Sequence, residues 1–106
     1  MLVACLCADW CGACREYRPL FDALTAKFPH VRFPWVDVED EADLIDPIEV
    51  ENFPTILIAS DAKPLFFGTV LPHIDQLMRL IQEKSIAGVN PMPHDAALAQ
   101  LAAKLI

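Results

Sequence analysis

The stretch that decides the fold runs from residue 2 to residue 14 and reads LVACLCADWCGAC. Its first part, residues 2–8, is an unbroken apolar run, which is typical of a strand that is buried on both faces and central in a sheet. The segment after the stretch has apolar residues at helical spacing, namely Tyr17, Leu20, Phe21, Leu24 and Phe28. The sequence therefore predicts a central strand, a turn and a helix that ends at Pro29.

The remainder of the chain predicts further strands and helices. In chain order we expect a strand over residues 31–38, a helix over 41–50 capped by Asp40, strands over 55–59 and 63–67 with Gly68 closing the latter, and a helix from Ile74 to Ile81. Two strands joined by a helix imply a parallel βαβ unit, and the last two strands are close enough for a hairpin. Pro34 and Pro64 fall in the second and fourth strands. Because proline cannot donate to the ladder, both strands are predicted to lie at sheet edges.

The chain has 106 residues, which suits one domain. We place this domain at residues 1–87 and assign residues 88–106 to a proline-rich linker and a terminal amphipathic helix. The apolar stripe of that helix consists of Leu98, Leu101, Ala102 and Leu105. We expect the helix to pack on its own domain, and dimerisation or the capture of a partner is the alternative.

The charge and hydropathy of the chain exclude several kinds of partner. The net charge is −7, whereas nucleic acids and anionic membrane surfaces attract basic proteins. No run of about 18 apolar residues is present, and the apolar start lacks the basic residue and cleavage site of a secretory signal. The sequence therefore predicts a soluble, cytoplasmic protein that binds neither nucleic acid nor membranes.

All four cysteines, Cys5, Cys7, Cys11 and Cys14, lie within ten residues of one another. This crowding favours local chemistry, either redox or metal binding, over a framework of structural disulfides. Cys11 falls at the start of the predicted helix, where unpaired N–H groups and the positive dipole end stabilise a thiolate. Cys14 lies three residues further on the same helix face and is expected to be less exposed. In this interpretation Cys11 attacks a substrate disulfide, and Cys14 resolves the mixed disulfide that forms.

The segment Trp10-Cys11-Gly12-Ala13-Cys14 resembles the active-site motif of the thioredoxin family, with alanine where those proteins usually carry proline. Pro19 is similarly placed to the proline in the family's active-site helix, and Gly68 to the glycine after its final hairpin strand. Phe53-Pro54-Thr55 is similar to the family's cis-proline segment. The resemblance extends over roughly residues 1–86.

This resemblance implies an α/β thioredoxin fold with the order β-α-β-α-β-β-α and a mixed four-stranded sheet. The family's first strand and helix are missing, and the terminal helix is additional. The implied activity is that of a protein-disulfide reductase or oxidoreductase, which exchanges a Cys11–Cys14 dithiol or disulfide with protein substrates. Electrons would come from a dithiol protein or a small thiol, so neither a cofactor nor a metal is implied. We expect a monomer or weak dimer. The expected substrate-binding residues are Trp10, Gly12, Ala13, Phe53, Pro54 and Thr55, with Pro54 in the cis form.

Two departures from the family concern the strand before the motif. Cys5 stands where the family has a buried aspartate, and Cys7 stands where it has a tryptophan. The loss of the carboxylate removes a proton acceptor near Cys14 and predicts slower or differently poised exchange. Cys5 and Cys7 share one face of their strand. They are either small core residues or accessory thiols, with Cys5 close enough to Cys14 to exchange with it.

Two other functions fit the same residues. The first is a redox-silent interaction module that binds partners in the groove at Phe53 and Pro54. The second is a metal-binding domain, because four thiolates can hold zinc, although this cysteine spacing is not that of common zinc sites. The acidic stretch over residues 37–46 is either a solvated surface or one that attracts basic partners.

Overall fold

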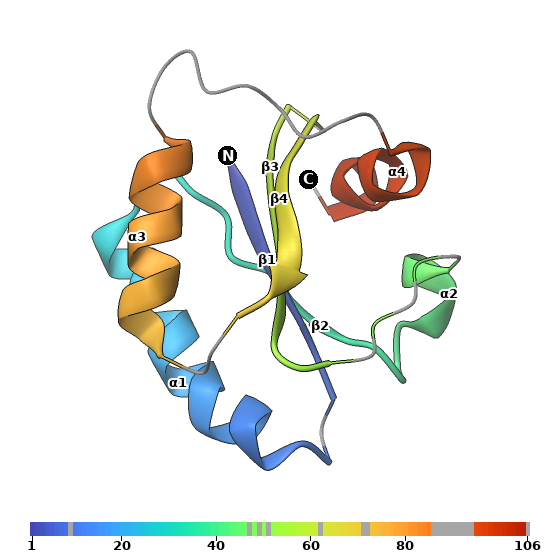
Figure 1. Cartoon of the computed structure of the whole chain (residues 1–106), viewed down its shortest axis with the longest axis horizontal. Coiled ribbons are helices and arrows are strands. Elements are labelled where there is room, and N and C mark those ends of the chain that lie inside the picture. Colours follow the sequence, from blue (N-terminus) through green and yellow to red (C-terminus); the bar gives the residue numbers. More distant parts are fainter. Residues whose placement is uncertain are drawn as a thin grey trace.

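The computed structural model describes residues 1–8, 10–46, 48, 50, 52–61, 63–70, 73–85 and 95–105. Within these ranges the elements are β1 (Leu2–Cys7), α1 (Gly12–Lys27), β2 (Trp35–Asp37), α2 (Ala42–Ile45), β3 (Thr55–Ser60), β4 (Lys63–Thr69), α3 (Ile74–Lys84) and α4 (Ala96–Leu105). Figure 1 shows the sheet between two helical layers, with α1 and α3 on one side and α2 and α4 on the other. No helix in the described part of the chain is long and apolar enough to cross a membrane.

The sheet has the strand order β2-β1-β3-β4. β1 pairs in parallel with β2 and antiparallel with β3, and β3 forms an antiparallel hairpin with β4. Every residue of β1 is buried, as the apolar run predicted. The two strands that carry or follow a proline are at the edges, which confirms the argument from Pro34 and Pro64.

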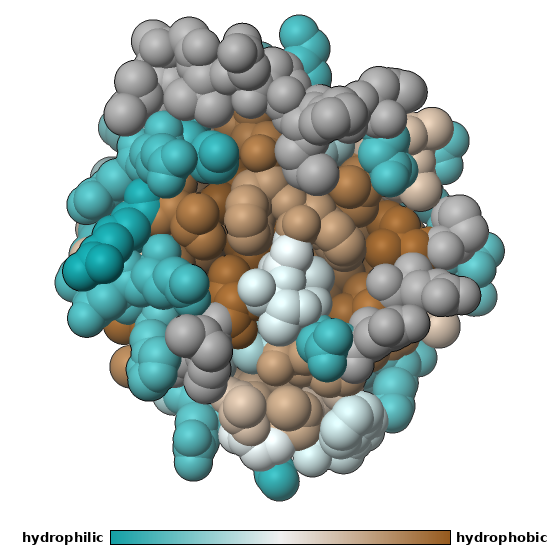
Figure 2. All heavy atoms as spheres, in the orientation of Figure 1, coloured by the Kyte–Doolittle hydropathy of each residue, from teal (hydrophilic) through white to brown (hydrophobic). Residues whose placement is uncertain are grey.

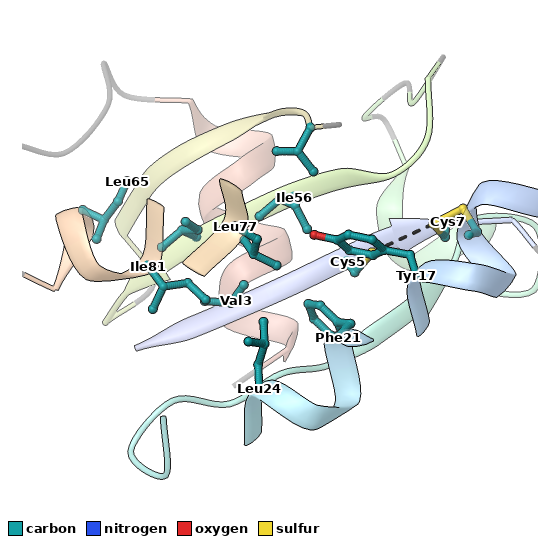
Figure 3. Packing of buried hydrophobic residues seen from close by; sticks show 13 residues of the cluster. Val3, Cys5, Cys7, Tyr17, Phe21, Leu24, Ile56, Leu65, Leu77 and Ile81 are labelled. Carbon is teal, nitrogen blue, oxygen red and sulfur yellow. Dashed lines mark hydrogen bonds between the residues drawn. A yellow bond between two sulfur atoms is a disulfide. The ribbon is translucent and has the colours of Figure 1, made fainter. Parts of the chain in front are cut away.

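The side chains of β1 alternate between two hydrophobic cores, one on each face of the sheet. Val3, Cys5 and Cys7 face α1 and α3, whereas Leu2, Ala4 and Leu6 face α2 and α4. Figure 3 shows how the first core brings side chains from both helices, including Tyr17, Phe21, Leu24, Leu77 and Ile81, against this strand. The two cysteines of β1 therefore lie on the face that the active-site helix covers, as their spacing predicted.

The terminal helix α4 packs on its own domain, as expected. Leu98, Leu101 and Ala102 are buried in the second core. The Oδ1 atom of Asp95 accepts a hydrogen bond from the backbone N–H of Leu98 at 3.1 Å and so caps the helix. The main contacts of α4 are with β4 and α2. Residues 86–94, which include the expected linker, lie outside the described residues.

Three elements show differences from the expected boundaries that have a structural reason. β2 is shorter than residues 31–38, and only an isolated bridge joins Arg32 to Leu2 ahead of it. β4 continues to Thr69, because Gly68 pairs with Ile56 inside the ladder and does not end the strand.

The third difference is α2, which is a single turn and not a helix over residues 41–50. Asp46 precedes a proline and has an extended ψ of 135°, because a following proline disfavours the helical conformation. Asp40 does not cap this helix, since the N-cap is Glu41. Instead, Oδ1 of Asp37 accepts hydrogen bonds from the backbone N–H groups of Glu39 and Asp40 at 2.9 and 3.0 Å.

The face of the molecule over β4 is partly apolar. Figure 2 shows hydrophobic side chains along the middle of this face, flanked by hydrophilic ones over α1 and α3. Phe66 and Phe67 of β4 are half-buried and pack against the cores on opposite sides of the sheet. This edge of the sheet is therefore less well covered than the central strands.

Candidate active site

Cys11 is the N-cap residue of α1 and has an extended backbone, with φ −82° and ψ 117°. Its carbonyl oxygen accepts a hydrogen bond from the N–H of Arg15 at 3.2 Å, which starts the helix. The thiol is half-buried and takes part in no disulfide. No acidic residue lies in the first turn of α1, so the positive end of the helix is available to stabilise negative charge on the sulfur.

Gly12 gives the start of the helix an open side. A Cβ atom built on this residue would have no other atom within 4 Å. Ala13, the next residue, is half-buried.

Cys14 forms a disulfide with Cys7, and the two Cα atoms are 5.9 Å apart. This separation is within the ordinary span of a disulfide. The pairing differs from the expected disulfide between Cys11 and Cys14. The reason is local: Cys7 ends β1 with its side chain on the face below the first turn of α1, where Cys14 points into the core.

Cys5 lies next to this disulfide and does not itself pair with Cys14. Its buried thiol donates a weak hydrogen bond to the sulfur of Cys7 at 3.9 Å. Burial raises the pKa of the Cys5 thiol strongly, so the group stays protonated at neutral pH. Of the two possible accessory thiols, Cys7 forms the disulfide with Cys14, and Cys5 is a buried free thiol in the core. Over the described residues, no group of three or more potential ligands is arranged to hold a metal ion.

Tyr17 is a functional candidate that the sequence analysis treated only as a core residue. Its hydroxyl is buried and has no hydrogen-bond partner among the described residues. Burial raises the pKa of this hydroxyl strongly, and its proximity to the Cys5 thiol, whose ionisation would place a second negative charge nearby, adds to the rise. Figure 3 shows the ring extending from α1 over Cys5. A tyrosine within an otherwise apolar stripe was the only signal of this residue in the sequence.

Trp10 and Phe53 form an aromatic wall beside Cys11. Their rings meet edge to face, with centroids 5.6 Å apart. Trp10 is 63% exposed, and its Nε1 donates a hydrogen bond to Oε1 of Glu39 at 2.6 Å. Phe53 and Cys11 both pack against the core cluster that contains the disulfide. The structure thus brings together the two segments that the sequence singled out, and it adds Glu39.

Pro54 and Thr55 lie beneath this wall. The Phe53–Pro54 peptide bond is cis, which confirms the expectation. The Pro54 carbonyl accepts a hydrogen bond from the N–H of Val70 at 3.1 Å. The Thr55 hydroxyl donates to the carbonyl of Asn52 at 2.6 Å and is buried. These groups hold the segment in place, and the half-buried Phe53 is its more exposed residue.

Comparisons with known proteins agree with this geometry. The family model for thioredoxin matches residues 1–83. The chain is 32% identical to a thioredoxin of Chlamydia trachomatis over 72% of its own length and 74% of that protein. It is 38% identical to an H-type thioredoxin of Fagopyrum esculentum, over 59% of the chain and only 54% of the relative.

The fold is also that of solved thioredoxins. The structure of Fasciola hepatica thioredoxin superimposes with a TM-score of 0.71 and 28% identity, covering 77% of this chain and 78% of the other. Mitochondrial thioredoxin 3 from Saccharomyces cerevisiae gives a TM-score of 0.69 and 28% identity, covering 77% and 76%. By sequence and by fold, therefore, this chain belongs to the thioredoxin family, a family of thiol–disulfide oxidoreductases.

Proposed function

We propose that this protein reduces or exchanges disulfides in protein substrates, with Cys11 as the attacking thiol and Cys14 as the resolving one. The observation that carries the proposal is the contrast between the two sulfurs. Cys11 is a half-buried free thiol at the positive end of α1. Cys14, one turn into the helix, is buried and already engaged in a disulfide within the core.

The reaction starts from the protein with both thiols reduced. The Cys11 thiolate attacks one sulfur of the substrate disulfide, and the other substrate sulfur leaves as a thiolate that takes up a proton. Cys14 then attacks the Cys11 sulfur of the mixed disulfide, and the second substrate thiol is released. Two electrons have passed to the substrate. A dithiol donor or a small thiol returns the protein to the reduced form without a bound cofactor.

The surface around Cys11 supports a polypeptide substrate. Trp10 and Phe53 offer an apolar wall, and Gly12 leaves the approach open. Ala13 extends this surface along the helix start, while Pro54 and Thr55 position the backbone beneath it. Glu39 and the neighbouring acidic side chains favour substrates with basic residues near the disulfide. We propose that the protein acts in the cytoplasm as a monomer or weak dimer, and the apolar surface over β4 is consistent with weak association.

A redox-silent binding module is the second candidate. What favours it is that Cys14 is bonded to Cys7, which leaves Cys11 without a resolving partner in this state. In that case Trp10 and Phe53 would bind a partner and no electrons would pass.

Insulin reduction with dithiothreitol as electron donor separates the two candidates. We expect turnover by the wild-type protein, loss of at least about 100-fold in Cys11→Ser because the nucleophile is gone, and retained turnover in the control Lys104→Ala, an exposed residue of α4. Equal rates in the wild-type protein and Cys11→Ser would exclude the proposed reaction and favour the binding module.

A further inference from the structure

The geometry points to Cys7 as a second resolving thiol. After a substrate has been reduced, Cys7 replaces Cys11 as the disulfide partner of Cys14. This inference rests on the proposed function. It assigns a chemical role to a residue that is a tryptophan in the family pattern and that the proposed reaction does not use.

The first argument is access. The exposed fractions of Cys7 and Cys14 are 0% and 1%, whereas Cys11 is half-buried. A protein disulfide cannot reach either sulfur of the buried pair. When a protein disulfide oxidises the folded protein, the Cys7–Cys14 disulfide therefore forms from inside the molecule, through the accessible thiol of Cys11.

The second argument is that Cys14 lies within reach of both partners. It is one helical turn from Cys11, and its Cα is 5.9 Å from that of Cys7 across the interface between α1 and β1. The Cα separation from Cys7 is within the ordinary span of a disulfide, and a spacing of three residues at the helix start is that of the expected Cys11–Cys14 disulfide.

The step itself balances. In the Cys11–Cys14 disulfide, the Cys7 thiolate attacks the Cys14 sulfur. A Cys7–Cys14 bond forms, the Cys11–Cys14 bond breaks, and Cys11 leaves as a thiolate, while the proton that Cys7 has lost passes to solvent. The protein stays oxidised by two electrons, so no further oxidant is needed.

The direction of this step follows from where the negative charge ends. The leaving sulfur is Cys11, at the N-terminus of α1, where the helix stabilises an anion. The attacking sulfur, Cys7, is in an apolar core in which an anion is unfavourable. Exchange therefore moves charge from the core to the helix end and moves the disulfide from the surface to the core.

The consequence is an oxidised protein with a free nucleophile. Cys11 can form a mixed disulfide with a further substrate, but Cys14 is not available to resolve it. Oxidation would thus convert the protein from a reductase into a form that holds its substrate covalently until an external dithiol attacks the exposed mixed disulfide at Cys11.

Disulfide mapping of the wild-type protein tests the inference without any mutation. The reduced protein is oxidised with insulin, quenched in acid at a series of times, alkylated under denaturing conditions and digested for mass spectrometry. We expect the Cys11–Cys14 disulfide at early times and an excess of Cys7–Cys14 of about tenfold or more at the end. An end state with Cys11–Cys14 alone and with Cys7 alkylated would overturn the inference.

Two variants sharpen the result. Cys7→Ala is expected to stop at the Cys11–Cys14 disulfide, whereas the matched control Cys5→Ala, on the same face of the same strand, is expected to end at Cys7–Cys14. Loss of the Cys7–Cys14 product in Cys5→Ala would count against a specific role for Cys7.

The outcomes also separate this inference from the proposed function. If insulin is reduced and the protein ends at Cys11–Cys14, the proposed function stands and the role of Cys7 is wrong. If insulin is not reduced, oxidised glutathione replaces it as the probe. If the Cys7–Cys14 disulfide then forms through a transient Cys11–Cys14 disulfide, the exchange is supported although the proposed function fails. If the Cys7–Cys14 disulfide forms in Cys11→Ser at the wild-type rate, the exchange is overturned.

Discussion

Cys5 and Tyr17 place two neutral polar groups beneath the site, where the family carries a carboxylate. Burial raises the pKa of both side chains, so neither carries a charge at neutral pH. A protonated thiol and a phenol do not accept a proton from Cys14 as a carboxylate does. The chemistry at Cys14 therefore depends on solvent or on a neighbouring thiol, which fits the slower exchange that the sequence predicts.

The Tyr17 hydroxyl is expected to contribute nothing to stability. It is buried and unpaired within the described residues, and an unsatisfied hydroxyl costs about 1–3 kcal/mol. Tyr17→Phe keeps the ring and removes the cost, so its free energy of unfolding should equal or exceed that of the wild type. Tyr17→Ala should lose about 3–5 kcal/mol, because it leaves a cavity. Urea unfolding measures both changes, and a destabilised Tyr17→Phe would reveal a hydrogen bond to the hydroxyl.

The raised pKa of the Cys5 thiol predicts how the free energy of unfolding changes with pH. Its ordinary pKa is 9.0 and its pKa in the folded protein is far higher. Above about pH 9 the unfolded chain loses this proton and the folded chain keeps it, so the free energy of unfolding falls as the pH rises. Below pH 9 both states keep the proton, and the contribution is constant. Urea unfolding between pH 8 and 10 should show the fall in the wild type and a smaller one in Cys5→Ala. An identical slope in the variant would contradict the assignment.

At the scale of elements, the site is built from the ends of four segments. The turn before α1 provides Trp10, the start of α1 provides Cys11, the segment after β2 provides Glu39, and the segment before β3 provides Phe53. Substrate contacts made by these ends can change without disturbing the strands that position them.

Trp10→Ala is therefore expected to act on substrate binding and not on folding. The indole is 63% exposed, and it forms the outer half of the aromatic wall. We expect the KM for insulin to rise about tenfold, with a thermal midpoint close to that of the wild type. Glu39→Gln keeps an acceptor for the Trp10 N–H but removes a charge, and its KM for basic peptides should lose part of its dependence on salt. An unchanged KM in Trp10→Ala would show that the aromatic wall of Trp10 and Phe53 does not contribute to substrate binding.

The positions of these elements were predictable to different degrees. Pro64 in β4 and Pro34 directly before β2 predicted that these two strands lie at the sheet edges, because a missing N–H disfavours a central place. The helix α2 is shorter than its sequence pattern predicted, because the proline that follows Asp46 disfavours the helical conformation at that residue. The disulfide partner of Cys14 could not be predicted from sequence spacing alone. Cys7 and Cys11 are both near it along the chain, and the packing of α1 over β1 decides between them.

At the scale of the whole molecule, the sheet separates the core that contains the cysteines from the core that the terminal helix covers. The four cysteines and Tyr17 lie on the side of α1 and α3. The buried residues of α4 belong to the core on the other side. Substitutions that shorten side chains in the second core are therefore expected to lower the stability of the protein without altering the reactions of the cysteines in the first core.

Leu101→Ala tests this separation. Leu101 is 1% exposed, and its truncation should cost about 2–5 kcal/mol of unfolding free energy. At temperatures where the variant remains folded, its cysteines should form the same disulfides at the same rates as those of the wild type. Lys104→Ala, on the exposed side of the same helix, should change neither property. Altered disulfide pairing in folded Leu101→Ala would show that the two cores are coupled.

The measurement that tests the central claim most directly is the capture of a mixed disulfide. Reduced Cys14→Ser is mixed with insulin, quenched in acid and analysed by peptide mass spectrometry, with Cys11→Ser as the matched control. If Cys11 is the thiol that substrates meet, an adduct forms in Cys14→Ser with insulin joined to Cys11, and the control forms none. An adduct on Cys5 or Cys7, or equal adducts in both variants, would contradict the account.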